Sequence, residues 1–141
     1  MRHIRIELDL SSFANAVERF AEGLEALAQQ PGHSLIRDGV IQRFEFTYEL
    51  AHKMLRRYLE MTDASPESFD GMTFQDLIRT GNEQGLLLHD WTAWKEYRQS
   101  RTDTSHTYHE EKAVRVIGRI PVFLEEARFL LGQLRQRTGQ E

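Results

Sequence analysis

Polar and titratable side chains gather in one segment, from Tyr97 to Glu111, where a helical protein would normally place apolar residues. Arg101 and His106 lie five residues apart across a predicted helix break, so the backbone can turn both side chains into one cleft. A guanidinium can hold a phosphate with its planar fork of donors, and a histidine that titrates near neutrality can exchange a proton with a ribose hydroxyl. This pair is sufficient for metal-independent RNA cleavage, and Tyr108 follows two residues later.

Each of these residues also has a purely structural interpretation. Arg101 can form a surface ion pair with Asp103 or a nearby glutamate, which would contribute little to stability. His106, together with Ser105, can cap the last helix, where backbone amides lack partners. Tyr108 can lie at the edge of the core with its hydroxyl in water. The residue pattern alone leaves these alternatives open.

Basic residues beyond the segment could bind a nucleic-acid backbone. Lys112, Arg115 and Arg119 recur at i, i+3 and i+7, which places three positive charges on one helical stripe. A solvated face, whose charge is diluted by Glu110 and Glu111, is the favoured interpretation of the stripe. The candidate RNA- or phosphate-binding residues are Arg98, Lys112, Arg115 and Arg119.

Acidic residues are candidates for supporting roles. Glu45 and Glu49 stand four apart and are either partly buried partners of Arg101 or, as we expect, members of helix-surface pairs. Asp103 can orient His106 or pair with Arg101, and its negative charge can equally repel RNA. The candidate supporting residues are Asp103, Ser105 and Glu49.

Aromatic residues and histidines are weaker candidates. Trp91, Trp94 and Tyr97 share one helical face and could stack bases, but such stripes usually belong to a core or a dimer interface. His106 and His109 stand three apart, yet no carboxylate is placed as a third metal ligand. We therefore predict no metal and no cofactor.

The apolar spacing predicts the helices that position these residues. A first helix runs over about 12–29 from a cap at Ser11 or Ser12, and a long second helix runs from a cap at Ser34 through Leu59. Residues 62–72 form a loop.

Three further elements follow. Thr73 with Asp76 opens a short helix that ends near Gly81 or Gly85, and Asp90 caps a fourth helix. After a polar break at 100–105, a last helix runs to about 135, with a bend at Gly118 and Pro121. Helices joined by short links predict an all-α, antiparallel up-and-down bundle of four to five helices with a bent C-terminal helix.

The composition sets broad limits on function. With 141 residues, 40% hydrophobic and 28% charged, the chain is predicted to form a single globular domain over 1–141. The absence of cysteine and of any apolar run of about 20 residues predicts a cytoplasmic protein without a membrane span. A net charge of -4 lowers the expectation of broad nucleic-acid wrapping but permits a local basic patch.

The first ten residues alternate between apolar and charged types. This alternation predicts an extended N-terminal arm over 1–10 that can pair with its own copy. The alternative is a frayed tail whose leucines pack on the bundle.

Two sequence blocks together resemble a known family. The blocks are Arg101-(four residues)-His106-Thr107-Tyr108 and the segment from Arg37 to Leu50, RDGVIQRFEFTYEL. They resemble the HEPN-domain proteins, specifically the branch of nucleotidyltransferase substrate-binding proteins and of toxins paired with a minimal nucleotidyltransferase. The family position after the arginine is often asparagine, whereas this chain has Thr102.

The resemblance implies a fold, an activity and partners. It implies an antiparallel helical bundle that forms a homodimer, with Arg101 and His106 as the nuclease pair near the dimer cleft. RNA would be the substrate, and a minimal nucleotidyltransferase antitoxin would silence the toxin by adenylylating Tyr108. A second interpretation is a non-catalytic substrate-binding or regulatory subunit that holds nucleotide or RNA for a nucleotidyltransferase.

Overall fold

The computed structural model describes residues 7–140 and contains no β-strand within that range. Six α-helices and three 3-10 turns follow one another along this described part of the chain. The α-helices are α1 (Ser11–Gln29), α2 (Ser34–Thr62), α3 (Phe74–Glu83), α4 (Trp91–Asp103), α5 (Glu110–Arg119) and α6 (Phe123–Arg137). The 3-10 turns are η1 (Pro66–Phe69), η2 (Thr104–His106) and η3 (Ile120–Val122).

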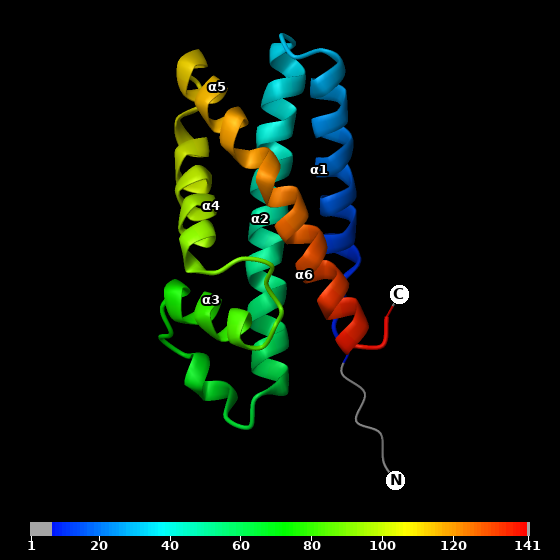
Figure 1. Cartoon of the computed structure of the whole chain (residues 1–141), viewed down its shortest axis with the longest axis vertical. Helices are drawn as coiled ribbons and strands as arrows, with labels where there is room; N and C mark the ends of the chain where they lie inside the picture. The colour runs from blue at the N-terminus through cyan, green and yellow to red at the C-terminus, as the bar shows by residue number, and fades with distance from the viewer. Residues whose placement is uncertain (1–6, 141) are drawn as a thin grey trace.

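The long helices alternate in direction. In Figure 1, α1 rises beside the descending α2, α4 rises on the other side, and α5 and α6 descend together across the bundle. The short α3 and turn η1 lie beside the lower half of α2. The all-α, antiparallel up-and-down bundle expected from the sequence is therefore confirmed.

The C-terminal helix is interrupted where the sequence predicts a bend. Pro121 cannot donate a backbone hydrogen bond, and the α-helix gives way there to η3 before α6 begins. Because α5 and α6 continue in the same general direction in Figure 1, they act as one long element with an irregular turn.

Aromatic side chains from three helices fix α4 against the rest of the bundle. Phe123 of α6 lies 5.5 Å from Phe44 of α2, 5.7 Å from Trp94 and 5.0 Å from Tyr97, measured between ring centroids. Trp94 and Tyr97 are buried in this cluster. Trp94 and Tyr97 therefore belong to the core of the chain and are not available to stack bases, and Trp91 is partly buried beside Phe74.

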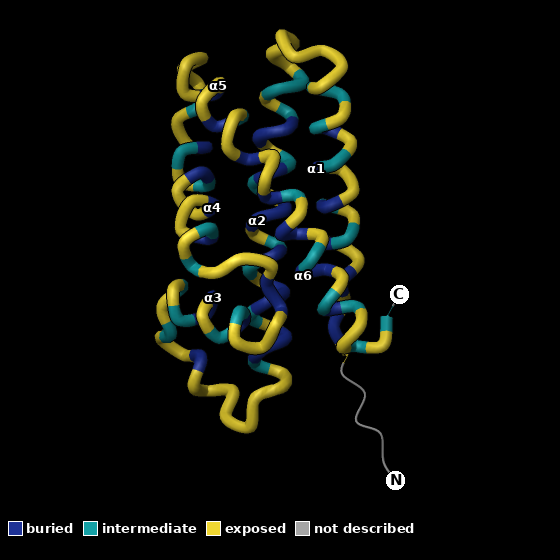
Figure 2. Tube along the Cα trace, viewed as in Figure 1, coloured by how far each residue is buried: buried dark blue, intermediate teal, exposed yellow. Residues whose placement is uncertain are grey.

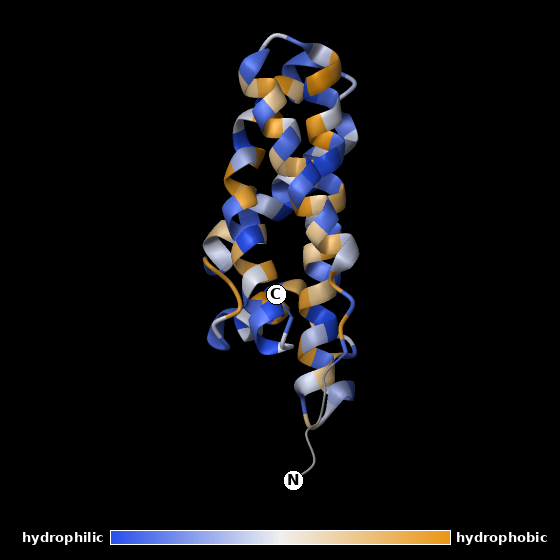
Figure 3. Ribbon diagram, turned by 90° about the vertical axis from the view of Figure 1, so that its right-hand side faces the viewer, coloured by the Kyte–Doolittle hydropathy of each residue, from blue (hydrophilic) through white to orange (hydrophobic). Residues whose placement is uncertain are grey.

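Burial follows the amphipathic pattern of the helices. Buried residues face inward along each long helix (Figure 2), and hydrophilic and hydrophobic residues alternate along the helices in the view turned by 90° (Figure 3). None of the helices in the described part of the chain is both long and apolar enough to cross a membrane.

Two of the predicted helix caps are confirmed. The Thr73 hydroxyl accepts a hydrogen bond from the Asp76 amide at 3.1 Å, and the Asp90 carboxylate accepts one from the Thr92 amide at 3.0 Å. These caps fix the starts of α3 and α4.

The other two predicted caps are wrong. Ser11 is already the first residue of α1 and donates its amide and hydroxyl hydrogens to the carboxylate of Asp9. Ser34 is likewise the first residue of α2, and the ring nitrogen Nδ1 of His33 accepts from the Ile36 amide at 3.2 Å. In both cases an acceptor placed earlier in the chain takes the role expected of serine.

The predicted N-terminal arm lies mostly outside the described residues. Leu8 and Leu10 are buried in the core, and the side-chain amide of Gln140 donates to the carbonyl of Leu8 at 2.8 Å. The leucines of this segment therefore pack on the bundle, as the alternative interpretation expects. Residues 1–6, and with them most of the alternating pattern, are not described.

A buried glutamate holds the loop that leads into α4. Glu126 of α6 is fully buried, and its carboxylate accepts the backbone amides of Leu88 at 2.6 Å and His89 at 3.1 Å. The Tyr97 hydroxyl also donates to Glu126 at 3.4 Å. No motif in the sequence distinguishes Glu126 from other helical glutamates, because its role depends on a contact with a residue 38 positions earlier.

Candidate functional site

Helix α4 extends farther along the chain than the sequence predicts and includes Arg101. The expected break at 100–105 begins only after Asp103, because the buried Ser100 still accepts the backbone amide of Thr104 in a helical hydrogen bond. Arg101 therefore projects from the last turn of a helix, and the loop-like segment is confined to η2 and the residues up to His109.

The guanidinium of Arg101 is held against α2. Its Nη2 and Nε atoms lie 2.5 Å and 3.1 Å from Oε1 of Glu49, and Nη1 donates to the Thr104 hydroxyl at 3.1 Å. Glu45 is farther away, with Oε2 3.9 Å from Nη1. The side chain of Arg101 is 27% exposed, so the group is partly shielded from water but remains reachable.

These contacts decide between the two interpretations of the acidic pair on α2. Glu49 and Glu45 are partners of Arg101, and the expectation that they form ordinary helix-surface pairs is wrong. The four-residue spacing was informative because it places both carboxylates on the same face of α2. Only the packing of α4 on α2 shows that this face meets Arg101.

Tyr48 is a buried residue of α2 that lies within the electrostatic influence of this ion pair. Burial raises the pKa of its phenol to about 12, although the positive charges of Arg98 and Arg101 act in the opposite direction. The Tyr48 hydroxyl is therefore neutral at physiological pH and is not a candidate base.

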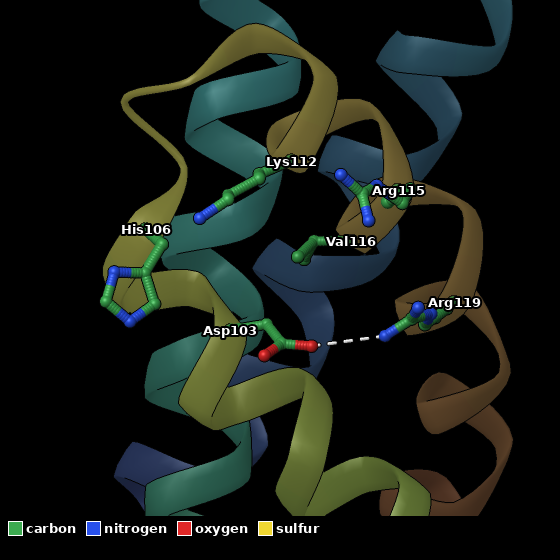
Figure 4. A pocket seen from close by; sticks show the side chains of 6 residues that line it. All are labelled: Asp103, His106, Lys112, Arg115, Val116 and Arg119. Atoms are coloured by element: carbon green, nitrogen blue, oxygen red, sulfur yellow. Dashed lines mark hydrogen bonds and ion pairs between the residues drawn. The ribbon is translucent and has the colours of Figure 1, made fainter.

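His106 opens onto a different side of the motif. It is exposed at the end of η2 and lines a pocket of about 120 Å³. Figure 4 shows the polar side chains of this pocket arranged around Val116. Its lining residues are Asp103, His106, Lys112, Arg115, Val116 and Arg119.

Arg101 and His106 thus face different neighbours in this structure. The hydrogen bonds of Arg101 go to α2 and to Thr104, whereas His106 borders the basic residues of α5. The sequence predicts that both side chains turn into one cleft. Among the described residues, however, Arg101 and His106 make no direct contact with each other and have different neighbours.

Asp103 takes neither of the two roles considered from the sequence. Its Oδ1 accepts a hydrogen bond from the side-chain Nε2 of Gln99 at 3.0 Å, and its Oδ2 lies 3.1 Å from Nη1 of Arg119. Asp103 therefore neutralises part of the basic stripe. It lines the same pocket as His106.

Tyr108 is largely exposed to solvent. The residue is 77% exposed, and its ring centroid lies 4.4 Å from that of His109 and 6.4 Å from that of His106. The alternative that Tyr108 is a residue of the core edge is wrong. The other three tyrosines, Tyr48, Tyr58 and Tyr97, are buried.

The capping interpretation of His106 and Ser105 is also wrong. Helix α5 begins only at Glu110, and its N-cap residue is His109, which makes no side-chain capping bond. Ser105 is exposed in η2. The carboxylates of Glu110 and Glu111 lie in the first turn of α5, where negative charge is favourable.

One candidate phosphate-binding residue lies apart from the others. The guanidinium carbon of Arg98 lies 5.3 Å from the ring centroid of Phe74, the first residue of α3, and Arg98 does not line the pocket with His106. Lys112, Arg115 and Arg119 do line it.

Sequence reasoning missed two contacts that shape the segment. Thr104 is buried and bonds to Arg101, and Arg37 near the start of α2 lies 3.3 Å from Glu110 at the start of α5. Thr104 follows Arg101 by one helical turn, which is the only sequence signal for its role. Between residues 7 and 140, no group of three His, Asp or Glu side chains could hold a metal ion.

Comparisons with known proteins place the chain in a family. Residues 8–136 match the family described as "Nucleotidyltransferase substrate binding protein like". The chain is 43% identical over 109 residues to a Haemophilus influenzae protein named "Probable ribonuclease HepT", and the match covers 74% of each chain.

Two solved structures have the same fold. One, from Haemophilus influenzae, was described as the fold of a substrate binding domain of a nucleotidyltransferase. It matches with a TM-score of 0.84 at 34% identity, over 91% of this chain and 100% of its own. A crystal structure from Thermus thermophilus matches with a TM-score of 0.62 at 31% identity, over 85% of this chain and 98% of its own.

Proposed function

The chain belongs to the nucleotidyltransferase substrate-binding protein family, as its resemblance predicts, and from this premise we propose that it is a toxin acting as a metal-independent endoribonuclease in the cytoplasm. The observation that carries the proposal is the exposed His106 in a pocket lined by three basic side chains. The relative named as a ribonuclease supports it.

The proposed reaction uses the ribose as its own nucleophile. The imidazole of His106 accepts the proton of a 2'-hydroxyl, and the resulting oxygen attacks the adjacent phosphorus. The bond from phosphorus to the 5'-oxygen breaks, and that oxygen takes a proton from the imidazolium or from water. The products are a 2',3'-cyclic phosphate end and a 5'-hydroxyl end.

Arg101 would stabilise the charge that develops on the phosphate. To do so, its guanidinium must exchange the Glu49 carboxylate for the non-bridging oxygens of the phosphate, which can accept hydrogen bonds from the same N–H groups. The partial exposure of the pair leaves room for this exchange.

Cleavage of RNA by the purified chain tests the proposal. Cleavage should persist in the presence of a chelator, leave cyclic phosphate ends and be lost in His106→Ala. His109→Ala is the matched control, because His109 is exposed three residues later but does not line the pocket. If His106→Ala and wild type degrade RNA equally, the role of His106 is wrong.

A second candidate function is a non-catalytic subunit that binds nucleotide or RNA for a nucleotidyltransferase. The pairing of Arg101 with Glu49, away from His106, favours it, as does the solved relative described as a substrate binding domain. This function requires phosphate binding without cleavage, so the same assay with intact-RNA recovery separates the two.

We also propose that a minimal nucleotidyltransferase partner silences the chain at Tyr108. The phenolic oxygen attacks the α-phosphate of ATP, pyrophosphate leaves, and the phenolic proton passes to solvent or a base of the partner. Tyr108 supports this role because it is exposed while the other tyrosines are buried. The ring of Tyr108 lies beside His106, so the added AMP would cover this histidine.

Intact-mass measurement after co-expression with the partner tests this assignment. Wild type should gain AMP units, and Tyr108→Phe should gain none and stay toxic. Equal adducts on both proteins would exclude Tyr108 as the modified residue.

Finally, we propose a homodimer, which the resemblance to the family implies. Support comes from Phe46 of α2, which is 55% exposed and lines an open groove with Leu50 beside Glu49. Sedimentation should show a dimer that Phe46→Glu weakens. A clean monomer of wild type at micromolar concentration would refute the proposal.

A further inference from the structure

The basic residues of α5 converge on one small pocket in a chain whose net charge is -4. Lys112, Arg115 and Arg119 all line this pocket, and Asp103 is the one acid in its lining. A solvated face would spread its charges along the helix, whereas these side chains surround a hollow next to His106 (Figure 4).

Not every acidic residue near Lys112, Arg115 and Arg119 neutralises their positive charge. Glu110 is engaged by Arg37 at 3.3 Å, on the side of α5 that faces α2. Asp103 pairs with Arg119 at 3.1 Å. Within the described residues, Lys112 and Arg115 make no ion pair, so their charges are available to a ligand.

We propose that this pocket binds a backbone phosphate of single-stranded RNA through Lys112 and Arg115, with Arg119 joining when it leaves Asp103. The inference rests on the proposed function, because a ribose whose 2'-hydroxyl reaches His106 brings a neighbouring backbone phosphate to the pocket that His106 lines. Arg101, which is held by Glu49, then serves the reacting phosphate, and the α5 cations hold a neighbouring one.

Binding of an RNA that cannot be cut tests the pocket separately from cleavage. A 2'-O-methyl oligonucleotide lacks the nucleophile, so fluorescence anisotropy reports binding alone. Removing one phosphate contact should lower the salt slope of binding by about 0.7, which is about fourfold in affinity at about 0.15 M salt. The double variant Lys112→Gln with Arg115→Gln removes this one phosphate contact and should therefore bind about fourfold more weakly than wild type.

Two further variants test the pocket in other ways: one is a control with the same change in charge, and the other is expected to strengthen binding. Arg57→Gln with Arg128→Gln removes the same charge from exposed positions outside the pocket and should leave the affinity and the salt slope close to those of wild type. Asp103→Asn removes the acid from the pocket and frees Arg119, so it should bind RNA about fourfold more tightly.

The outcomes separate the pocket from the proposed function. If the two double variants bind equally, or if Asp103→Asn weakens binding, the pocket assignment is wrong even when RNA is cleaved. If wild type binds RNA through Lys112 and Arg115 without cutting ordinary RNA, the nuclease proposal fails and the pocket stands. AMP is the second probe: binding of AMP that depends on Lys112, without such dependence for RNA, would overturn the RNA assignment.

Discussion

Replacing Glu126 with alanine should destabilise the protein, because this side chain connects α6 to the loop that leads into α4. Its carboxylate accepts the backbone amides of Leu88 and His89 from a fully buried position. The loop ends at Asp90, which caps α4, and α4 carries Arg101 in its last turn. The substitution therefore weakens the attachment of the loop before α4, and with it the positioning of Arg101, although Glu126 does not contact Arg101.

The magnitude follows from opposing effects. Each amide that loses a buried acceptor costs about 1–3 kcal/mol, but Leu88 and His89 are exposed residues, so water can replace part of the loss. Removing a charge from a buried site returns some free energy. We expect a net loss of about 2 kcal/mol at neutral pH, which lowers Tm by roughly 4–8 °C for a chain of this size.

The pH dependence gives a second test. Burial raises the pKa of Glu126 above its ordinary value of 4.5, while the hydrogen bonds from Leu88 and His89 oppose the shift. Stability linked to a raised pKa is fully present below the unfolded value and is lost as pH rises through the folded value. The stability of Glu126→Gln relative to wild type should therefore increase as pH rises from about 4.5 towards neutrality.

Thermal and urea denaturation followed by circular dichroism measure both effects. Glu125→Ala and Glu125→Gln are matched controls, since Glu125 is the exposed neighbour of Glu126 on the same helix. The reasoning is refuted if Glu126→Ala unfolds within about 0.5 kcal/mol of its Glu125 control. A stability difference between Glu126→Gln and wild type that does not change with pH would refute the pKa assignment.

Three further outcomes are expected. Gly132→Ala in α6 should stabilise the protein by about 0.5–1 kcal/mol in a denaturation experiment, because a Cβ there meets no atom within 4 Å. Gly81→Ala should instead destabilise it by about 1 kcal/mol, since its Cβ would lie 3.0 Å from a methyl group of Leu55; equal Tm changes for the two glycines would contradict this packing. Glu49→Gln should change stability by less than about 1 kcal/mol because its ion pair with Arg101 is partly exposed, and a larger loss would show that the pair is structurally essential.

The helices could be predicted from local sequence because the apolar period and the caps are local properties. Thr73 and Asp90 start α3 and α4 as predicted, since a side-chain acceptor needs only a nearby backbone amide. The caps at Ser11 and Ser34 failed for the same local reason: Asp9 and His33 offered acceptors slightly earlier in the chain.

The identity of the candidate residues was also readable from the sequence. Arg101, His106 and Tyr108 stand in a polar segment, and the resemblance of that segment to a family predicted the fold that the structure shows. Exposure was harder to predict. Residue type does not distinguish Tyr108, which is exposed, from Tyr97, which is buried.

Only the tertiary structure decided which side chains meet. The carboxylate that holds Arg101 is that of Glu49 on α2, 52 residues earlier. The pocket of His106 is completed by Arg119, which also binds Asp103 across 16 residues. Such contacts depend on the packing angle and rotation of whole helices, which the aromatic core around Phe123 sets. The sequence therefore determined the helices and their chemical groups, and the packing between helices determined that Arg101 faces a carboxylate while His106 faces the basic pocket.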